Sequence, residues 1–104
     1  NLLARLNREL DADFDLSQFN HRVVWNAAAS RVESYLESQI DQVVCLTGAG
    51  CCVSLSAGER IWTESSYKYE PETVIAMCEG VGFTQQAQWI DSDSQFALTL
   101  LETK

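Results

Sequence analysis

Apolar residues recur at helical spacing in the first ten residues, "NLLARLNREL". The leucines of this segment fall on one helical face: Leu2, Leu3, Leu6 and Leu10. The following "DADFDLSQF" is acidic and rich in turn-forming residues, so it ends the predicted helix. We expect the helix to pack through its leucine face.

From residue 22 the apolar period changes to two, which is typical of strands. The strands "RVVW" and "RVESYLESQI" flank the turn "NAAAS", and in the second of them Val32, Leu36 and Ile40 share an apolar face that Ser34 interrupts. The short runs "VVCL" and "CCVSL" follow, separated by "TGAG", and a turn at "SAGE" leads into "ERIWTESSYKY". The pattern predicts an antiparallel meander over this middle part.

A single helix is predicted in "EPETVIAMCEGVG", where Pro71 suits the first helical position and Gly80 or Gly82 can end the helix in a left-handed conformation. After it, "FTQQAQWI" and "QFALTLLE" alternate around the polar "DSDS" and predict a hairpin, with Phe83, Ala87 and Trp89 on one face. The expected fold class is therefore α+β, with a mainly antiparallel sheet, an N-terminal helix, and a second helix before a C-terminal β-hairpin.

Composition narrows the classes of partner. The chain has 104 residues, the length of one small domain, and its 15 acidic against 7 basic residues give a formal charge of −8. This charge repels phosphate backbones and anionic lipids, so we expect no nucleic acid and no membrane partner. Neither a membrane-spanning apolar run nor a signal-peptide pattern is present, which leads us to expect a cytoplasmic protein.

The four cysteines do not have the spacing of a zinc site, and the lone His21 completes no ligand set. We therefore expect no metal, and reduced thiols that serve as small apolar residues. The "TGAG" stretch contains a GxG, but a strand-like run follows it where a nucleotide loop would open a helix. A hairpin turn is favoured there over a cofactor loop.

Three polar residues, Glu64, Ser65 and Ser66, stand in the middle of the strand-like "ERIWTESSYKY", so we expect polar residues opposite them in the sheet. Glu64 and Ser66 are two apart and share a face, with Trp62 and Lys68 expected to flank them. A carboxylate and a hydroxyl so placed could hold the two nitrogens of an imidazole. From the residues alone, an ordinary solvated strand face is the favoured alternative.

Four segments together carry a family resemblance: "NRELDADFDLSQF", "RVESYLES", "TESSYKY" and "GFTQQAQWIDSDSQFALTL". In this order and spacing they resemble the C-terminal part of the S-adenosylmethionine-dependent histidine Nα-methyltransferases, which make trimethylhistidine on the route to ergothioneine. "TESSYKY" resembles the family's strand motif, whose Glu and Ser hold the imidazole of the substrate. The resemblance thus implies that Glu64 and Ser66 bind the substrate.

The resemblance also implies an organisation. Residues 1–69 would be the end of the substrate-binding subdomain, and residues 70–104 the last helix and β-hairpin of a Rossmann-like methyltransferase core. In the family the cofactor loop and the residues that grip the substrate's carboxylate and amine lie further upstream. The chain is then expected to be a fragment with no catalytic or cofactor-binding residues of its own, and inactive alone. S-adenosylmethionine and L-histidine would be ligands of the complete enzyme, and an N-terminal methyltransferase portion would be the chain's partner. We also expect the fragment to self-associate.

Ser34 departs from the family pattern. The family commonly has Met at this position, where it lines the substrate pocket, so Ser34 is a third substrate-binding candidate that removes bulk and adds a hydroxyl. Another amino-acid substrate therefore remains an alternative, although Glu64 and Ser66 favour an imidazole. A second alternative is a non-catalytic module of the same shape that binds a partner or an amino acid without turnover.

Overall fold

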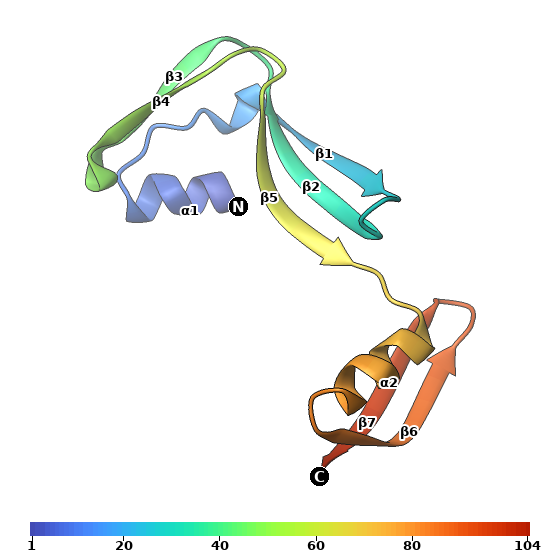
Figure 1. Ribbon diagram of the computed structural model, residues 1–104. Coiled ribbons are helices and arrows are strands. Elements are labelled where there is room, and N and C mark those ends of the chain that lie inside the picture. Colours follow the sequence, from blue (N-terminus) through green and yellow to red (C-terminus); the bar gives the residue numbers. More distant parts are fainter. The chain divides into compact units, whose positions relative to one another are not determined.

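The computed structural model describes residues 1–104, which form two compact units, Asn1–Tyr67 and Lys68–Lys104 (Figure 1). The first unit contains α1 (Leu2–Glu9), β1 (Phe19–Asn26), β2 (Arg31–Ser38), β3 (Gln42–Leu46), β4 (Cys51–Leu55) and β5 (Arg60–Tyr67), with two short 3-10 turns, η1 (Leu16–Gln18) and η2 (Thr47–Ala49). The second unit contains α2 (Pro71–Glu79), β6 (Phe83–Asp91) and β7 (Phe96–Thr103). All strand pairs are antiparallel, so the predicted α+β class with antiparallel sheets is confirmed.

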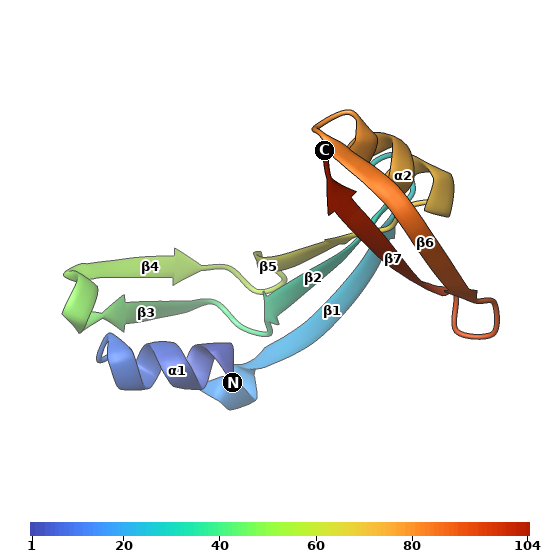
Figure 2. The same ribbon diagram turned by 90° about the horizontal axis from the view of Figure 1, so that it is seen from below.

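Helix α1 packs through Leu3 and Leu6 of its predicted leucine face, whereas Leu2 is exposed. The buried core of the first unit consists of Leu3, Phe14, Val44 and Leu55. Leu6 of α1 packs against this cluster as well. In Figures 1 and 2 the helix runs beside the β3–β4 hairpin, which is where Val44 and Leu55 lie. No helix of the chain is long and apolar enough to span a membrane.

The middle strands do not form a simple meander. β1, β2 and β5 make a three-stranded sheet in that order, while β3 and β4 form a separate two-stranded sheet. The chain leaves the sheet after Ser38, whose buried hydroxyl donates to the carbonyl oxygen of Ile40 at 2.7 Å, and returns as β5 to pair with β2. Ile40 lies beyond the end of β2, so the apolar face predicted to run from Val32 to Ile40 stops short of it. The β3–β4 hairpin therefore lies outside the three-stranded sheet and buries its apolar face against α1.

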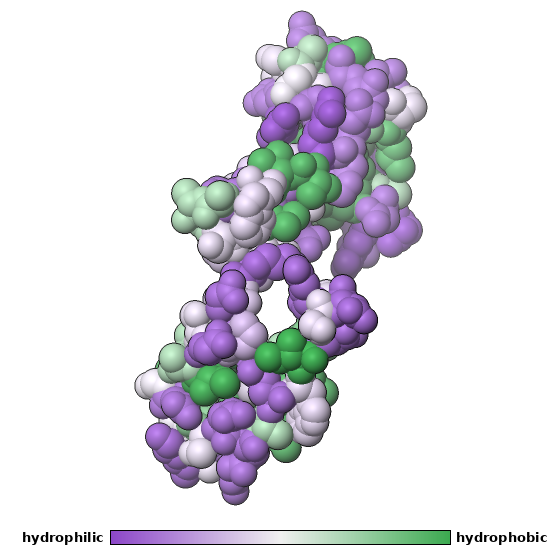
Figure 3. Space-filling model, turned by 90° about the vertical axis from the view of Figure 1, so that its right-hand side faces the viewer, coloured by the Kyte–Doolittle hydropathy of each residue, from purple (hydrophilic) through white to green (hydrophobic).

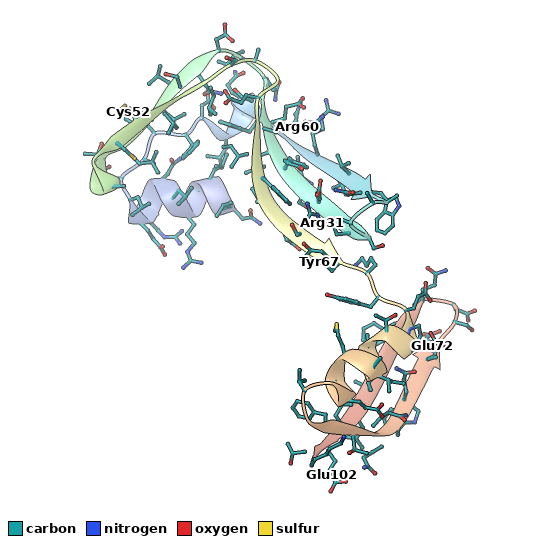
Figure 4. All side chains as sticks on the ribbon, in the orientation of Figure 1. Arg31, Cys52, Arg60, Tyr67, Glu72 and Glu102 are labelled. Atoms are coloured by element: carbon teal, nitrogen blue, oxygen red, sulfur yellow. A yellow bond between two sulfur atoms is a disulfide. The ribbon has the colours of Figure 1, made fainter.

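The "TGAG" stretch joins β3 to β4, which confirms the predicted hairpin. Gly48 is needed because a Cβ there would lie 2.8 Å from the carbonyl oxygen of Leu10. The expectation of reduced thiols is wrong for two cysteines: the register places Cys45 opposite Cys52, and the two form a disulfide (Figure 4). Sequence reasoning missed the pair because it depends on the register of the hairpin.

The second unit follows its predicted pattern closely. Pro71 begins α2, and β6 pairs with β7 along the whole hairpin. Gly80 keeps helical angles, whereas Gly82 has a φ of 100° and so provides the left-handed turn after the helix. On the hairpin face that meets α2, Gln88 Nε2 donates to the carbonyl oxygen of Pro71 at 3.3 Å and to Thr99 Oγ1 at 3.0 Å.

The hairpin face that points away from α2 is apolar and exposed. Because Gln88 and Thr99 point toward the helix, their neighbours along each strand point away from it. These include four large residues that are each more than half exposed: Trp89, Phe96, Leu98 and Leu100. A register shift between Gln85 and Ala87 puts Phe83 on the α2 side, so the prediction that Phe83 shares a face with Trp89 is wrong. Figure 3 shows apolar residues at the surface of both units.

Candidate functional site

Two of the predicted site residues line one hollow in the first unit. Ser34 on β2 pairs directly with Glu64 on β5, and both line a hollow of about 590 Å³. The other residues of the lining are Asn1, Leu2, Phe19, His21, Leu36 and Thr63. This volume lies in the range of small-molecule sites, and most of the lining residues are polar. The expectation of polar residues opposite this part of the strand is confirmed for Glu64 and for Ser65, which pairs with Glu33, and is wrong for Ser66, which pairs with Val32.

A β-bulge shapes the β5 side of the hollow. Ser34 pairs with Glu64 but Tyr35 pairs with Trp62, so Thr63 is an extra residue in β5. The Thr63 hydroxyl donates to the carbonyl oxygen of Ser34 at 3.1 Å. Because strand partners share a face, Trp62 lies with Tyr35 on the face opposite to Glu64. The expectation that Trp62 flanks Glu64 is therefore wrong, since the extra residue reverses the alternation.

The face opposite to the hollow carries a cluster of aromatic and charged residues. The Arg31 guanidinium lies 4.6 Å from the centre of the Trp62 ring and 5.4 Å from that of Tyr67, and its Nη1 donates to the Tyr67 hydroxyl at 2.7 Å. Figure 4 shows Arg31 and Tyr67 on β2 and β5. Tyr35 packs against Trp62 with ring centres 6.0 Å apart. These contacts tie β2 to β5 on both sides of the bulge.

A buried carboxylate anchors this cluster. Glu33 is 6% exposed and accepts hydrogen bonds from the Tyr35 hydroxyl at 2.8 Å, from Arg31 Nε at 2.6 Å and from Asn26 Nδ2 at 3.1 Å. These bonds, that of Tyr35 foremost, hold the pKa of the Glu33 carboxyl below its ordinary value. Glu33 and Tyr67 in turn raise the pKa of Arg31. Glu33 is thus an ionised group of the folded sheet, with partners on β1 and β2.

Ser66 lies further along β5, opposite Val32, where it is half-buried. It shares the face of Glu64 by strand alternation, but it is not among the residues that line the hollow. The structure therefore brings Ser34 and Glu64 together and places Ser66 beside them. The substrate-binding role of each stays a prediction.

His21 is a lining residue that sequence reasoning missed. It stands on β1 opposite Leu36 of β2, two residue pairs along the ladder from the Val23–Ser34 pair, and lines the same hollow as Ser34 and Glu64. The signal was present in the sequence: a hairpin turn at residues 27–30 sets the register of β1 against β2. Metal-ligand spacing gives His21 no role, whereas the β1–β2 register places it at the hollow.

The chain belongs to the family of S-adenosylmethionine-dependent histidine-specific methyltransferases, whose sequence profile matches residues 1–103. It is 40% identical over 100 residues to the histidine N-alpha-methyltransferase of Mycolicibacterium smegmatis and 38% identical over 100 residues to that of Mycobacterium tuberculosis. Each match covers 96% of this chain but 31% of the relative. The chain thus spans about a third of the length of these relatives.

Proposed function

We propose that this chain is the C-terminal, substrate-recognising part of a histidine Nα-methyltransferase, which transfers a methyl group from S-adenosylmethionine to the α-amine of L-histidine. The observation that carries the proposal is the pairing of Ser34 with Glu64 at one hollow, in a chain that belongs to this family. The names of the two mycobacterial relatives support the same substrate. A route to ergothioneine and a cytoplasmic location are part of the proposal.

In this proposal Glu64 and Ser66 read the imidazole ring. Imidazole has two distinct ring nitrogens, of which one donates and one accepts in the neutral form. A carboxylate that accepts from the ring N–H, with a hydroxyl at the other nitrogen, selects one tautomer and one ring orientation. Glu64 lies on the hollow and Ser66 follows it on the same strand face, which fits this arrangement. Fixing the ring also restricts where the α-amine lies.

The cofactor supplies the reactive methyl group when it is bound. The residues of this chain contribute recognition: Glu64 accepts, Ser34 and Thr63 present hydroxyls, and Leu36 provides an apolar wall. We assign residues 1–69 to the end of a substrate-binding subdomain and residues 70–104 to the last helix and hairpin of a Rossmann-like core. The upstream part of the enzyme would then hold S-adenosylmethionine and the amino-acid end of the substrate, and the chain alone would bind no cofactor.

The exposed hairpin face supports a partner for the second unit. Trp89, Phe96, Leu98 and Leu100 leave an apolar surface of a kind that small monomeric domains seldom expose. We propose that the upstream methyltransferase portion covers this apolar face, because the relatives are about three times as long as the matched segment. Without that portion the chain would bury the same face by self-association.

Mass spectrometry of histidine incubated with S-adenosylmethionine tests the proposal. The full-length protein that contains this chain should convert histidine to its Nα-methylated forms, and the 104-residue chain alone should give no product above a no-protein control. Histidine binding by the full-length protein without any methylated product would favour the non-catalytic module. Product from the isolated chain would contradict the assignment of the cofactor site to the upstream part.

A further inference from the structure

We propose that Trp62 is a positioning residue for Glu64: its indole N–H, held in place by Arg31, fixes the backbone of the β-bulge so that the Glu64 carboxylate points into the hollow. The inference rests on the proposed function, because it assumes that Glu64 reads the substrate ring. It assigns a role to a side chain on the opposite face of the sheet from the hollow. Trp62 acts through Glu64 and does not touch the substrate.

The first step is the hydrogen bond within the bulge. Trp62 Nε1 donates to the backbone carbonyl oxygen of Glu64 at 3.1 Å, across the extra residue Thr63. On the partner strand, the Thr63 hydroxyl donates to the carbonyl oxygen of Ser34 at 3.1 Å. A bulge disrupts the regular ladder and so leaves backbone groups that side chains can satisfy. The first bond therefore holds the carbonyl group of Glu64 itself, and the second holds Thr63, the residue before it, against β2.

The second step is the clamp on the indole. Trp62 is 50% exposed, so burial alone does not fix its ring. Arg31 covers one face at 4.6 Å from the ring centre, which is a cation–π distance, and Tyr35 packs against the ring as well. Arg31 is itself fixed by its 2.6 Å bond to the buried Glu33 and its 2.7 Å bond to Tyr67. The ring is thus held in the position from which its N–H reaches Glu64.

The third step links this geometry to binding. Glu64 is an exposed residue that lines the hollow, so the position of its backbone decides which part of the hollow its carboxylate can reach. Binding groups lose effectiveness when they move by a fraction of an ångström to one ångström from the productive position. Loss of the Trp62 bond should therefore weaken recognition of the imidazole specifically. Contacts with the rest of the amino acid should be retained.

The test uses Trp62→Phe in the full-length protein, because phenylalanine keeps an aromatic face under Arg31 and removes only the N–H donor. Calorimetry should show a loss of histidine affinity of about threefold to tenfold, the size of one neutral hydrogen bond. Affinity for phenylalanine, which has no ring nitrogen, should stay unchanged. Trp89→Phe in the second unit is the control for the same chemical change, since Trp89 does not line the hollow and its substitution should change the affinity for neither ligand.

The double variant Trp62→Phe/Glu64→Ala separates positioning from a general structural effect. If Trp62 acts through Glu64, the double variant should bind histidine as weakly as Glu64→Ala alone. Additive losses, equal losses for histidine and phenylalanine, or wild-type histidine affinity in Trp62→Phe would overturn the inference while leaving the proposed function intact. Wild-type histidine affinity in Glu64→Ala would instead overturn the proposed role of Glu64, on which the inference depends.

Discussion

Ser34 on β2 lies directly opposite Glu64 on β5, and both residues line the same hollow. Directly opposed residues of antiparallel strands have Cβ atoms roughly 5 Å apart, so the size of one side chain sets the room beside the other. Ser34 is therefore in a position to set how large a ring fits next to the Glu64 carboxylate.

Ser34→Met should narrow the hollow beside Glu64. We expect the full-length variant to lose affinity for tryptophan relative to histidine by about tenfold or more, because a pocket discriminates by the volume it leaves. Competition binding of the two amino acids measures the ratio. Ser34→Ala removes the hydroxyl with little change in volume and should leave the ratio nearly unchanged. An unaltered ratio in Ser34→Met would show that Ser34 does not face the bound ring.

Acid should destabilise the first unit through Glu33. Hydrogen bonds from Tyr35, Arg31 and Asn26 favour the ionised carboxylate and lower its pKa on folding. Such a group stabilises the fold above its ordinary pKa, and this contribution is lost as the pH falls through the lower pKa of the folded state. Urea midpoints of the 104-residue chain should therefore fall as the pH drops below about 4.5, the ordinary pKa of a glutamate carboxyl.

Glu33→Gln should weaken this pH dependence and lower the midpoint at neutral pH. Glu79→Gln, an exposed carboxylate of the second unit, should keep the wild-type dependence on pH. The two variants carry the same chemical change. A difference between them in the slope of urea midpoint against pH therefore reports the hydrogen bonds of Glu33. Identical slopes for Glu33→Gln and wild type would contradict the assignment.

Thiol labelling tests the disulfide of the β3–β4 hairpin. Denatured but unreduced chain should take up two equivalents of a maleimide, at Cys51 and Cys78, because Cys45 and Cys52 are paired. Prior reduction should raise the uptake to four. Peptide mass spectrometry identifies the labelled residues, and four equivalents before reduction would mean that the hairpin thiols are free.

The exposed hairpin face should drive association of the isolated chain. We expect the sedimentation coefficient of the 104-residue chain to rise with concentration, and Leu98→Glu to suppress the rise by placing a charge in the apolar face. Val81→Glu is the control, because Val81 is 75% exposed but lies outside the hairpin strands. A strictly monomeric wild-type chain at high concentration would contradict the proposal that this face needs a cover.

The elements could be predicted from the sequence where local chemistry decides them. The leucine spacing of α1, Pro71 at the start of α2 and the polar turn between β6 and β7 are local signals, and the structure has all three elements. The pairing of β2 with β5 could not be predicted in this way. It depends on the β3–β4 hairpin, which lies outside the three-stranded sheet and packs its apolar residues against α1. That contact joins segments that are distant in the sequence.

Two details of the candidate site depend on register. Alternation placed Trp62 beside Glu64, but one extra residue at Thr63 moves Trp62 to the other face. The sequence of β5 has no glycine or proline to mark that bulge. His21 was overlooked for the same reason, because its place at the hollow follows from the β1–β2 register and not from any motif. The strand pattern marked Glu64 and Ser34 as polar exceptions, but only the resemblance to the family gave them a substrate-binding role.

The central claim is that Glu64 reads the imidazole of histidine, and calorimetric titration of the full-length protein tests it most directly. Glu64→Ala should weaken histidine binding by about 1.5 to 3 kcal/mol, the value of a hydrogen bond to a charged group, and Ser66→Ala by about 0.5 to 1.5 kcal/mol. Affinity for S-adenosylmethionine and for an amino acid without an imidazole should barely change. Equal losses for histidine and the analogue would show that Glu64 supports the strand and does not read the ring.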